Sequence, residues 1–201
     1  MNPSKKSEKS KIKNQNSNNG LNNWIGIIAI LILGFIIYSN TFNCAFQFDD
    51  KHNIVDFDGI RDLGNLKPMW EVNHSRFLSF LSFAINYHYG QLNVGGYHFV
   101  NLCIHLLNAC LVFWIIRLLF TTPALKNNNL AIHKSSIALV GALMFVSHPL
   151  ATGAVTYIVQ RMASMVATFY FLSIALYLKG RMEEGKAKYK YFVGVGLAAL
   201  C

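Results

Sequence analysis

The 201-residue sequence predicts an all-α, polytopic helical membrane protein. Hydrophobic residues make up 53% of the chain and charged residues only 13%, whereas a soluble domain usually carries about 25% charged residues. The mean hydropathy is +0.33. The apolar runs are long and continuous, which favours helices over the alternating pattern of a β-barrel, the other backbone structure that can span a bilayer.

Residues 1–23 form a polar tail that precedes the first apolar run. The tail holds five lysines among serines and asparagines, namely Lys5, Lys6, Lys9, Lys11 and Lys13. We expect it to be disordered and cytoplasmic. A cleaved signal peptide is the alternative, but the run that follows is long and no small-x-small cleavage site stands out, which favours an uncleaved anchor.

The first apolar run, residues 24–43, is long enough to cross a bilayer, which takes about 20 residues. Residues 44–96 then form an extracytoplasmic loop that contains most of the acid in the chain. Within the loop, Arg76–Tyr89 is expected to be a helix with its serines on one face, lying in the membrane interface. A re-entrant or ordinary core helix is the alternative.

Residues 97–201 contain the further transmembrane helices. Tyr97–Phe120 is one span, a stretch from Ser136 breaks at His148-Pro149, and Met162–Leu178 is another span. The last apolar run, from Tyr191 to Cys201, is incomplete. Lysine-rich connections separate the spans on the side of the basic tail, which places that side in the cytoplasm and the acidic loop outside. Topology thus accounts for the net charge of +9, and we do not expect a nucleic-acid partner.

The first acids after the first span are the adjacent Asp49 and Asp50, which makes them the leading catalytic candidates. A carboxylate pair at a membrane surface can remove a proton from a substrate or bind a divalent cation. Two adjacent aspartates are far short of a coordination set, so we assign no metal site and leave the cofactor unknown. The alternative is that both are solvated residues that begin a loop.

The second span carries His98, Asn101 and His105 on one narrow helical face, and Asn108 continues it. Polar side chains inside a membrane usually face the bundle or a water-filled cavity. The alternative is that they form hydrogen bonds between helices.

His148 and Arg161 flank the broken segment on the outer side. Pro149 ends the helix before it and holds His148 at the boundary. The planar guanidinium of Arg161 suits a lipid phosphate, and a snorkelling topology anchor is the alternative.

Four motifs carry a resemblance to a known family. They are Phe48-Asp49-Asp50, Ser75–Ser79, Gly96–His105 and His148–Arg161. In this order they resemble the membrane part of TMTC-type protein O-mannosyltransferases and their bacterial relatives, which belong to the GT-C glycosyltransferase superfamily. The resemblance covers about Trp24 onward, so the fold it implies is the amino-terminal part of a GT-C-like membrane domain.

The resemblance implies transfer of a sugar from a polyprenyl-phosphate carrier to a protein or glycan acceptor on the outer or luminal face. Asp49 or Asp50 would be the base that deprotonates the acceptor hydroxyl, and Arg161 would contact the carrier phosphate. The other expected substrate-binding residues are Arg76, His98, Asn101, His105 and His148. We expect an integral, multi-pass protein of the bacterial cytoplasmic membrane rather than the endoplasmic reticulum membrane.

The chain departs from this family in three respects. It has Arg76-Phe77-Leu78 where the family commonly has Arg-Pro-Leu, and Thr152-Gly153-Ala154-Val155 where the family commonly has an acid at the second position. Relatives also have more spans and often carboxy-terminal tetratricopeptide repeats, and no repeat of about 34 residues is visible here. We therefore expect a fragment of a longer enzyme that is inactive alone.

Two other functional classes compete with a glycosyltransferase. The chain could be a non-catalytic membrane scaffold or anchor for a partner. It could also be a transporter, since intramembrane histidine and asparagine can form polar pathways. The absence of acids within the spans argues against a proton-coupled transporter.

Overall fold

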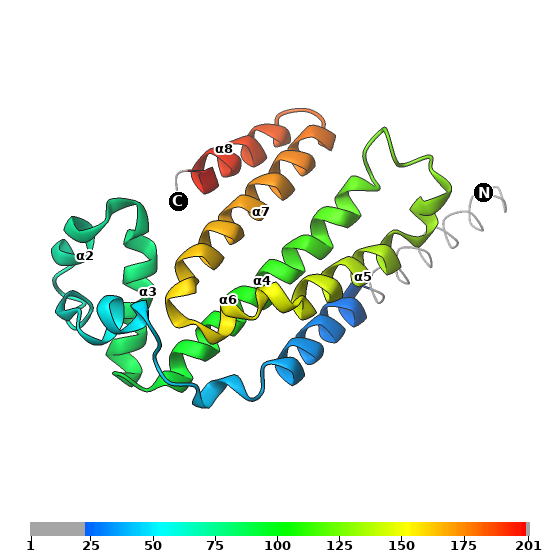
Figure 1. The fold of residues 1–201 in the computed structure, drawn as a ribbon. Coiled ribbons are helices and arrows are strands. Elements are labelled where there is room, and N and C mark those ends of the chain that lie inside the picture. Colours follow the sequence, from blue (N-terminus) through cyan, green and yellow to red (C-terminus); the bar gives the residue numbers. More distant parts are fainter. Residues whose placement is uncertain (1–22, 200–201) are drawn as a thin grey trace, which may run out of the picture.

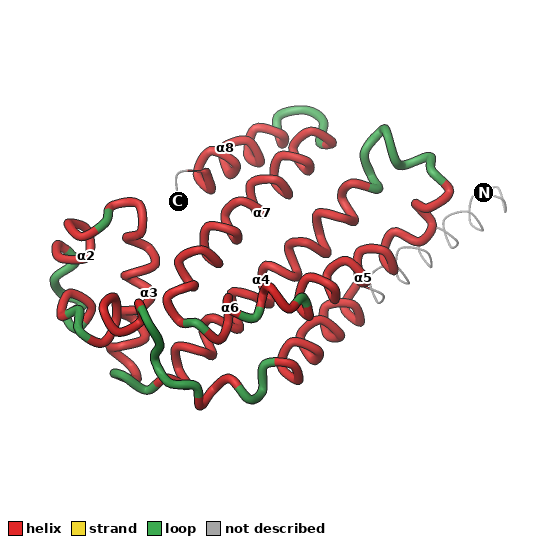
Figure 2. The backbone as a smooth tube through the Cα atoms, in the orientation of Figure 1, coloured by secondary structure: helices red, strands yellow, loops and turns green. Residues whose placement is uncertain are grey.

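The computed structural model describes residues 23–199. The expected disordered tail, except for Asn23, and the terminal Cys201 lie outside the described residues. Within residues 23–199 every regular element is helical (Figure 2), which confirms the predicted all-α fold. Three helices are long and apolar enough to cross a membrane, namely Val94–Leu119, Asn129–Ser147 and Ile158–Met182. They confirm a polytopic helical membrane protein.

The central helix is α4 (Val94–Leu119), which packs against both α5 (Lys134–Ser147) and α7 (Arg161–Met182). The 3₁₀-helix η5 (Asn129–His133) lengthens α5 at its start, so this span is longer than the run from Ser136 suggests. Helix α8 (Ala187–Ala199) folds back along α7 (Figure 1).

The first described helix, Asn23–Ile37, ends before the expected boundary at residue 43. A turn and a 3₁₀-helix, η1 (Thr41–Asn43), follow it. The helix lies close against α4, because a Cβ on Gly34 would collide with the Leu106 side chain. A glycine at a helix contact allows two backbones to approach in this way. A buried cluster joins this helix to α4 and α5, and its members include Ile30, Leu102, Leu106, Ala138 and Ala142.

The segment between α5 and α7 is broken at His148-Pro149, where the sequence predicts a break. Helix α5 ends at Ser147, and His148 is extended because a residue before proline avoids the helical region. Three short elements then cross to α7: η6 (Pro149–Ala151), α6 (Gly153–Thr156) and η7 (Ile158–Gln160).

Residues 44–93 fold into a lobe at one end of the helix bundle, which we call the outer lobe (Figure 1). Its two α-helices are α2 (Lys67–Val72) and α3 (Phe77–Gly90). The remaining elements are a π-helical turn η2 (Lys51–Val55), η3 (Asp58–Ile60) and η4 (His74–Arg76). The lobe has its own buried cluster, which includes Ile54, Met69, Phe80 and Phe83 and reaches Tyr97 of α4 and Ile158 of η7.

The serine and asparagine face of α3 points into the protein. Ser79 is buried, Ser82 contacts α7, and Asn86 Nδ2 donates to the carbonyl oxygen of Gly96 at 3.2 Å. On another side of the helix, Ile85 is 46% exposed. The polar stripe therefore serves packing against the bundle, and the position of α3 in the membrane interface stays a prediction.

Candidate functional site

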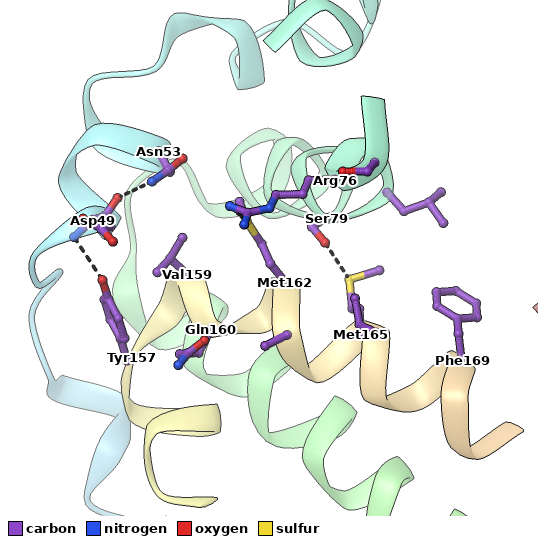
Figure 3. A pocket seen from close by; sticks show the side chains of 14 residues that line it. Asp49, Asn53, Arg76, Ser79, Tyr157, Val159, Gln160, Met162, Met165 and Phe169 are labelled. Atoms are coloured by element: carbon purple, nitrogen blue, oxygen red, sulfur yellow. Dashed lines mark hydrogen bonds between the residues drawn. The ribbon is translucent and has the colours of Figure 1, made fainter. Parts of the chain in front are cut away.

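A cavity of 370 Å³ lies between the outer lobe and the start of α7 (Figure 3). The outer lobe contributes Asp49 and Asn53 from the first loop and its turn η2, Ser75 and Arg76 from η4, and Leu78 and Ser79 from the start of α3. The opposite wall consists of Tyr157, Val159, Gln160, Met162, Ala163, Met165, Val166 and Phe169. One wall is thus mostly polar, and the other becomes apolar along α7.

Asp49 is exposed at the cavity and is held there by its backbone. Its amide N–H donates to the Tyr157 hydroxyl at 3.1 Å, and its carbonyl oxygen accepts from Asn53 Nδ2 at 2.8 Å. The Tyr157 hydroxyl also interacts with the Asp49 side chain. No ion pair involves the Asp49 carboxylate within residues 23–199, so it is available to a substrate.

The backbone that presents Asp49 has an uncommon conformation. Phe48 has φ of 43°, in the left-handed region that a bulky residue rarely adopts, and a π-helical turn begins at Lys51. The Phe48 side chain is 85% exposed and lies edge-on to Tyr157, with ring centroids 6.2 Å apart. Such strained positions and π-turns occur preferentially at functional sites.

Arg76 is the cation that borders this cavity. Its guanidinium is exposed, and its closest polar contact is Met162 Sδ, 3.8 Å from Nη1. No ion pair of Arg76 occurs in the described part of the chain. The cavity therefore combines an available carboxylate with an available guanidinium (Figure 3).

Asp50 has a different environment from its neighbour. It is fully buried, and its two carboxylate oxygens accept backbone N–H groups from Val159 at 2.7 Å and from Gln47 at 2.9 Å. Burial raises the pKa of this carboxyl, and the backbone N–H bonds partly offset that rise. Asp50 ties the first loop to η7 and does not border the cavity. This corrects the expectation that both aspartates are equivalent candidates for the base.

The polar face of α4 binds the broken segment between α5 and α7. Each of its four side chains lies within hydrogen-bonding distance of a main-chain carbonyl oxygen of that segment or the flanking helices. The pairs are His105 Nε2 and Val146 at 3.4 Å, His98 Nδ1 and Val155 at 3.0 Å, Asn101 Nδ2 and Ile158 at 3.1 Å, and Asn108 Nδ2 and Ser164 at 3.0 Å. None of the four borders the 370 Å³ cavity, so the contacts fit the alternative of hydrogen bonds between helices.

His98 additionally links this segment to the first loop. Its Nε2 lies 2.9 Å from the carbonyl oxygen of Cys44, while Nδ1 faces Val155. A neutral ring can donate to one of these oxygens and an imidazolium to both. In either state the ring is buried between main-chain groups and cannot contact a substrate in the cavity.

Arg161 is buried rather than exposed to a lipid phosphate. Its exposed fraction is 0%. Nε donates to Asn101 Oδ1 at 2.7 Å, Nη1 to the carbonyl and hydroxyl oxygens of Ser82 at 3.2 Å, and Nη2 to the carbonyl oxygen of Tyr97 at 2.9 Å. The guanidinium also lies over the Phe83 ring, 4.6 Å from its centroid. Its donors are already used within the protein, which corrects the expectation that Arg161 grips the carrier phosphate or snorkels to the surface.

His148 lies away from the cavity. It caps the turn at η6, where its Nδ1 accepts the N–H of Leu150 at 3.2 Å. It borders a separate, apolar cavity that includes Met144 and Leu150. His148, one of the expected substrate-binding residues, therefore does not border the cavity that contains Asp49.

A divalent cation does not fit the aspartate pair. Both oxygens of Asp50 already accept backbone N–H groups, which leaves Asp49 as the one available acid. Within residues 23–199 no three of the metal-ligating side chains His, Cys, Asp and Glu come together. We derive no chemical step through a metal ion.

Several cavity residues were not among the predicted site residues. Tyr157, Asn53, Met165 and Phe169 all border the cavity. Tyr157 stands within the motif that ends at Arg161, and Met165 and Phe169 share a helical face by their spacing of four. No sequence feature of this kind marks Asn53 as a site residue.

Most of the chain is similar in sequence to known proteins. Over 188 residues, 87% of the chain, the sequence is 30% identical to protein O-mannosyl-transferase Tmtc1 of Drosophila melanogaster. It is 30% identical to Tmtc3 of the same organism over 84% of the chain and 28% identical to human TMTC2, also over 84%. The chain is related to the TMTC-type protein O-mannosyl-transferases. No family model and no solved structure matches it.

The chain spans about a fifth of the length of the TMTC proteins it matches, since the alignments cover 20%, 20% and 21% of those three relatives. The relation extends across the outer lobe and the helices that build the cavity.

Proposed function

We propose that this chain forms part of a glycosyltransferase that transfers mannose from a polyprenyl-phosphate carrier to a hydroxyl group of a protein or glycan acceptor. The reaction would take place in the 370 Å³ cavity, on the outer or luminal face of the membrane. The observation that carries the proposal is that Asp49 and Arg76 border the same cavity without an ion pair to any described residue. The similarity to protein O-mannosyl-transferases suggests the reaction class.

Asp49 is the proposed general base. The acceptor hydroxyl gives its proton to the Asp49 carboxylate while its oxygen forms a bond to C1 of the mannose. The bond from C1 to the phosphate oxygen breaks, and the electron pair leaves with the phosphate. A positioned base typically contributes about 10²–10⁴-fold to such a reaction. The hydrogen bonds of Tyr157 and Asn53 to the Asp49 backbone support this role, because they fix the position from which the Asp49 side chain extends.

Arg76 is the proposed contact for the carrier phosphate. The leaving phosphate gains negative charge as the glycosidic bond breaks, and a guanidinium can stabilise that charge with two parallel N–H donors. The apolar wall of Met165, Val166 and Phe169 would face the first isoprene units of the carrier. This assignment replaces Arg161, whose donors are used internally.

The buried network gives the cavity its shape in this proposal. Asp50, Asn101 and Arg161 hold η7 and the start of α7 against the first loop and α3. They would act as positioning residues that do not touch the substrate.

We also propose that the protein lies in the bacterial cytoplasmic membrane rather than in the endoplasmic reticulum membrane.

The test is a transfer assay on membranes that contain the complete gene product. Labelled mannosyl-phosphopolyprenol and a nucleotide-linked mannose are offered as donors, and transfer to protein is measured. We expect transfer from the polyprenyl donor, and we expect Arg76→Gln to raise KM for that donor. Arg61→Gln is the matched control, because Arg61 is a basic residue of the same lobe that pairs with Asp58 outside the cavity.

Three results would count against the proposal. Transfer from the nucleotide-linked sugar alone would exclude the carrier, and equal effects of Arg76→Gln and Arg61→Gln would remove the phosphate contact. No transfer from either donor, with normal membrane insertion, would favour the alternative of a scaffold or anchor.

A further inference from the structure

A second cavity lies at the end of the bundle far from the candidate site. It has a volume of 290 Å³ and lies between the start of the first helix and the end of α4. Its lining residues are Asn23, Trp24, Ile27, Cys110, Phe113, Trp114 and Arg117. This cavity lies at the carboxy-terminal half of α4, whereas the outer lobe lies at the start of that helix. Because α4 has 26 residues and a helix rises about 1.5 Å per residue, the two are well separated.

Arg117 in this cavity has unsatisfied hydrogen-bonding capacity. Its Nε is buried and has no hydrogen-bond partner among the described residues, and no ion pair of Arg117 occurs among them. The guanidinium lies 5.6 Å from the centroid of the Phe113 ring. A charged donor without an acceptor is costly in such surroundings, so a ligand that supplies an acceptor would be stabilised here.

Asn23 adds a second unsatisfied group to the same cavity. Its buried Oδ1 also lacks a hydrogen-bond partner in the described part of the protein. A ligand that offers an anionic oxygen to Arg117 and a hydroxyl group to Asn23 would satisfy both. A glycerophosphate headgroup has this combination.

The charge at this end of the bundle favours an anion. Lys126 follows α4 and Lys134 begins α5, while Lys179 and Arg181 lie in the last turn of α7, Lys186 directly precedes α8 and Lys188 lies at its start. No acidic residue lies between Glu71 and Glu183 in the sequence. At the turn after α7, Glu183 pairs with Lys179 at 3.4 Å, and Glu184 is the only other acid there. Each lysine or arginine near a membrane surface adds to the attraction for anionic lipids.

The walls of the cavity favour an amphipathic ligand over a free ion. Trp24 and Trp114 flank it with Ile27, and tryptophan is enriched where headgroups meet acyl chains. Trp24 is 67% exposed and continues the cavity toward the outer surface of the first helix. A soluble phosphate would not use these apolar surfaces.

We propose that this cavity binds the headgroup of an anionic phospholipid. Arg117 contacts the phosphate, Asn23 contacts a headgroup hydroxyl, and an acyl chain lies along Trp24 between the first helix and α4. This site is distinct from the Asp49 cavity and does not depend on the proposed sugar transfer.

The test uses quenching of tryptophan fluorescence by brominated lipids. The 201-residue chain carries three tryptophans, and Trp70→Phe leaves the two that line the cavity. The chain is reconstituted in phosphatidylcholine vesicles, and brominated phosphatidylglycerol or brominated phosphatidylcholine is titrated in. The ratio of the two association constants reports preference for the anionic headgroup. We expect Arg117→Gln to lower this ratio about fivefold, the value of one basic contact near a membrane surface.

Arg181→Gln is the matched control, since Arg181 is exposed at the same end but outside the cavity. We expect it to leave the ratio unchanged, and we expect Arg117→Lys to keep part of the preference because the charge remains. An unchanged ratio in Arg117→Gln would overturn the proposal. So would an equal loss in Arg181→Gln, which would indicate general surface charge, or abolition of the preference by free inorganic phosphate, which would indicate a soluble anion.

Discussion

Arg161→Lys is the substitution that most sharply separates a buried structural arginine from a phosphate-binding one. Lysine keeps the positive charge, so a surface contact with phosphate would largely survive the change. A buried arginine loses its planar arrangement of donors. In this protein the guanidinium reaches three residues on three sides, Asn101, Ser82 and Tyr97, and stacks on Phe83.

The expected loss of stability follows from those contacts. A lysine ammonium at this position cannot reach all three acceptors, and we expect at least two of the four hydrogen bonds to be lost. Hydrogen bonds to charged groups contribute about 1.5–3 kcal/mol each, and the stacking on Phe83 contributes about 1 kcal/mol more. We therefore expect Arg161→Lys to lower the free energy of unfolding by about 4 kcal/mol or more.

The assay is reversible unfolding in mixed micelles, with increasing dodecyl sulfate and far-ultraviolet circular dichroism as the signal. Arg76→Lys is the control, because Arg76 is exposed and contacts only Met162 Sδ closely, so its unfolding free energy should change by less than about 0.5 kcal/mol. If Arg161→Lys changed the free energy of unfolding as little as Arg76→Lys, the buried hydrogen bonds of Arg161 would not contribute to stability.

Three further predictions test other parts of the structure. Burial raises the pKa of Asp50 in the folded state, so ionising this carboxyl costs stability. As pH rises from the ordinary aspartate pKa through the folded-state pKa, the parent should therefore lose free energy of unfolding relative to Asp50→Asn. A difference between the two proteins that does not change with pH would contradict the burial. Gly34→Ala should destabilise by about 1–3 kcal/mol through its collision with Leu106, whereas Gly196→Ala, with open space where the new Cβ would lie, should not. A cysteine placed at Asp56 should react with a membrane-impermeant reagent from outside intact cells, and reaction only after the cells are opened would reverse the predicted topology.

The helices and the main interruption could be predicted from sequence because local chemistry sets them. The end of α5 at Ser147 follows from His148-Pro149, since a residue before proline leaves the helical region. The clustering of His98, Asn101 and His105 on one face of α4 follows from helical periodicity. What those side chains contact does not follow, because their acceptors are carbonyl groups more than 40 residues away in sequence.

The candidate site was harder to predict because adjacent residues have opposite environments. Asp49 and Asp50 are indistinguishable by position relative to the first span, yet one is exposed at a cavity and the other is fully buried. That difference depends on Val159, which is 109 residues from Asp50 and donates its backbone N–H. Arg161 shows the same limit, because a basic residue at a helix start suggests a surface anchor until its tertiary acceptors are known.

The central claim is that Asp49 performs the chemistry while Asp50 positions the loop, and transfer kinetics of the two asparagine variants test it most directly. In the complete gene product, Asp49→Asn should lower kcat by about 10²–10⁴-fold and leave the free energy of unfolding unchanged. Asp50→Asn should lower the free energy of unfolding by about 1–3 kcal/mol, because one buried N–H loses its acceptor. Parental turnover in Asp49→Asn would contradict the account and leave the cavity without its base.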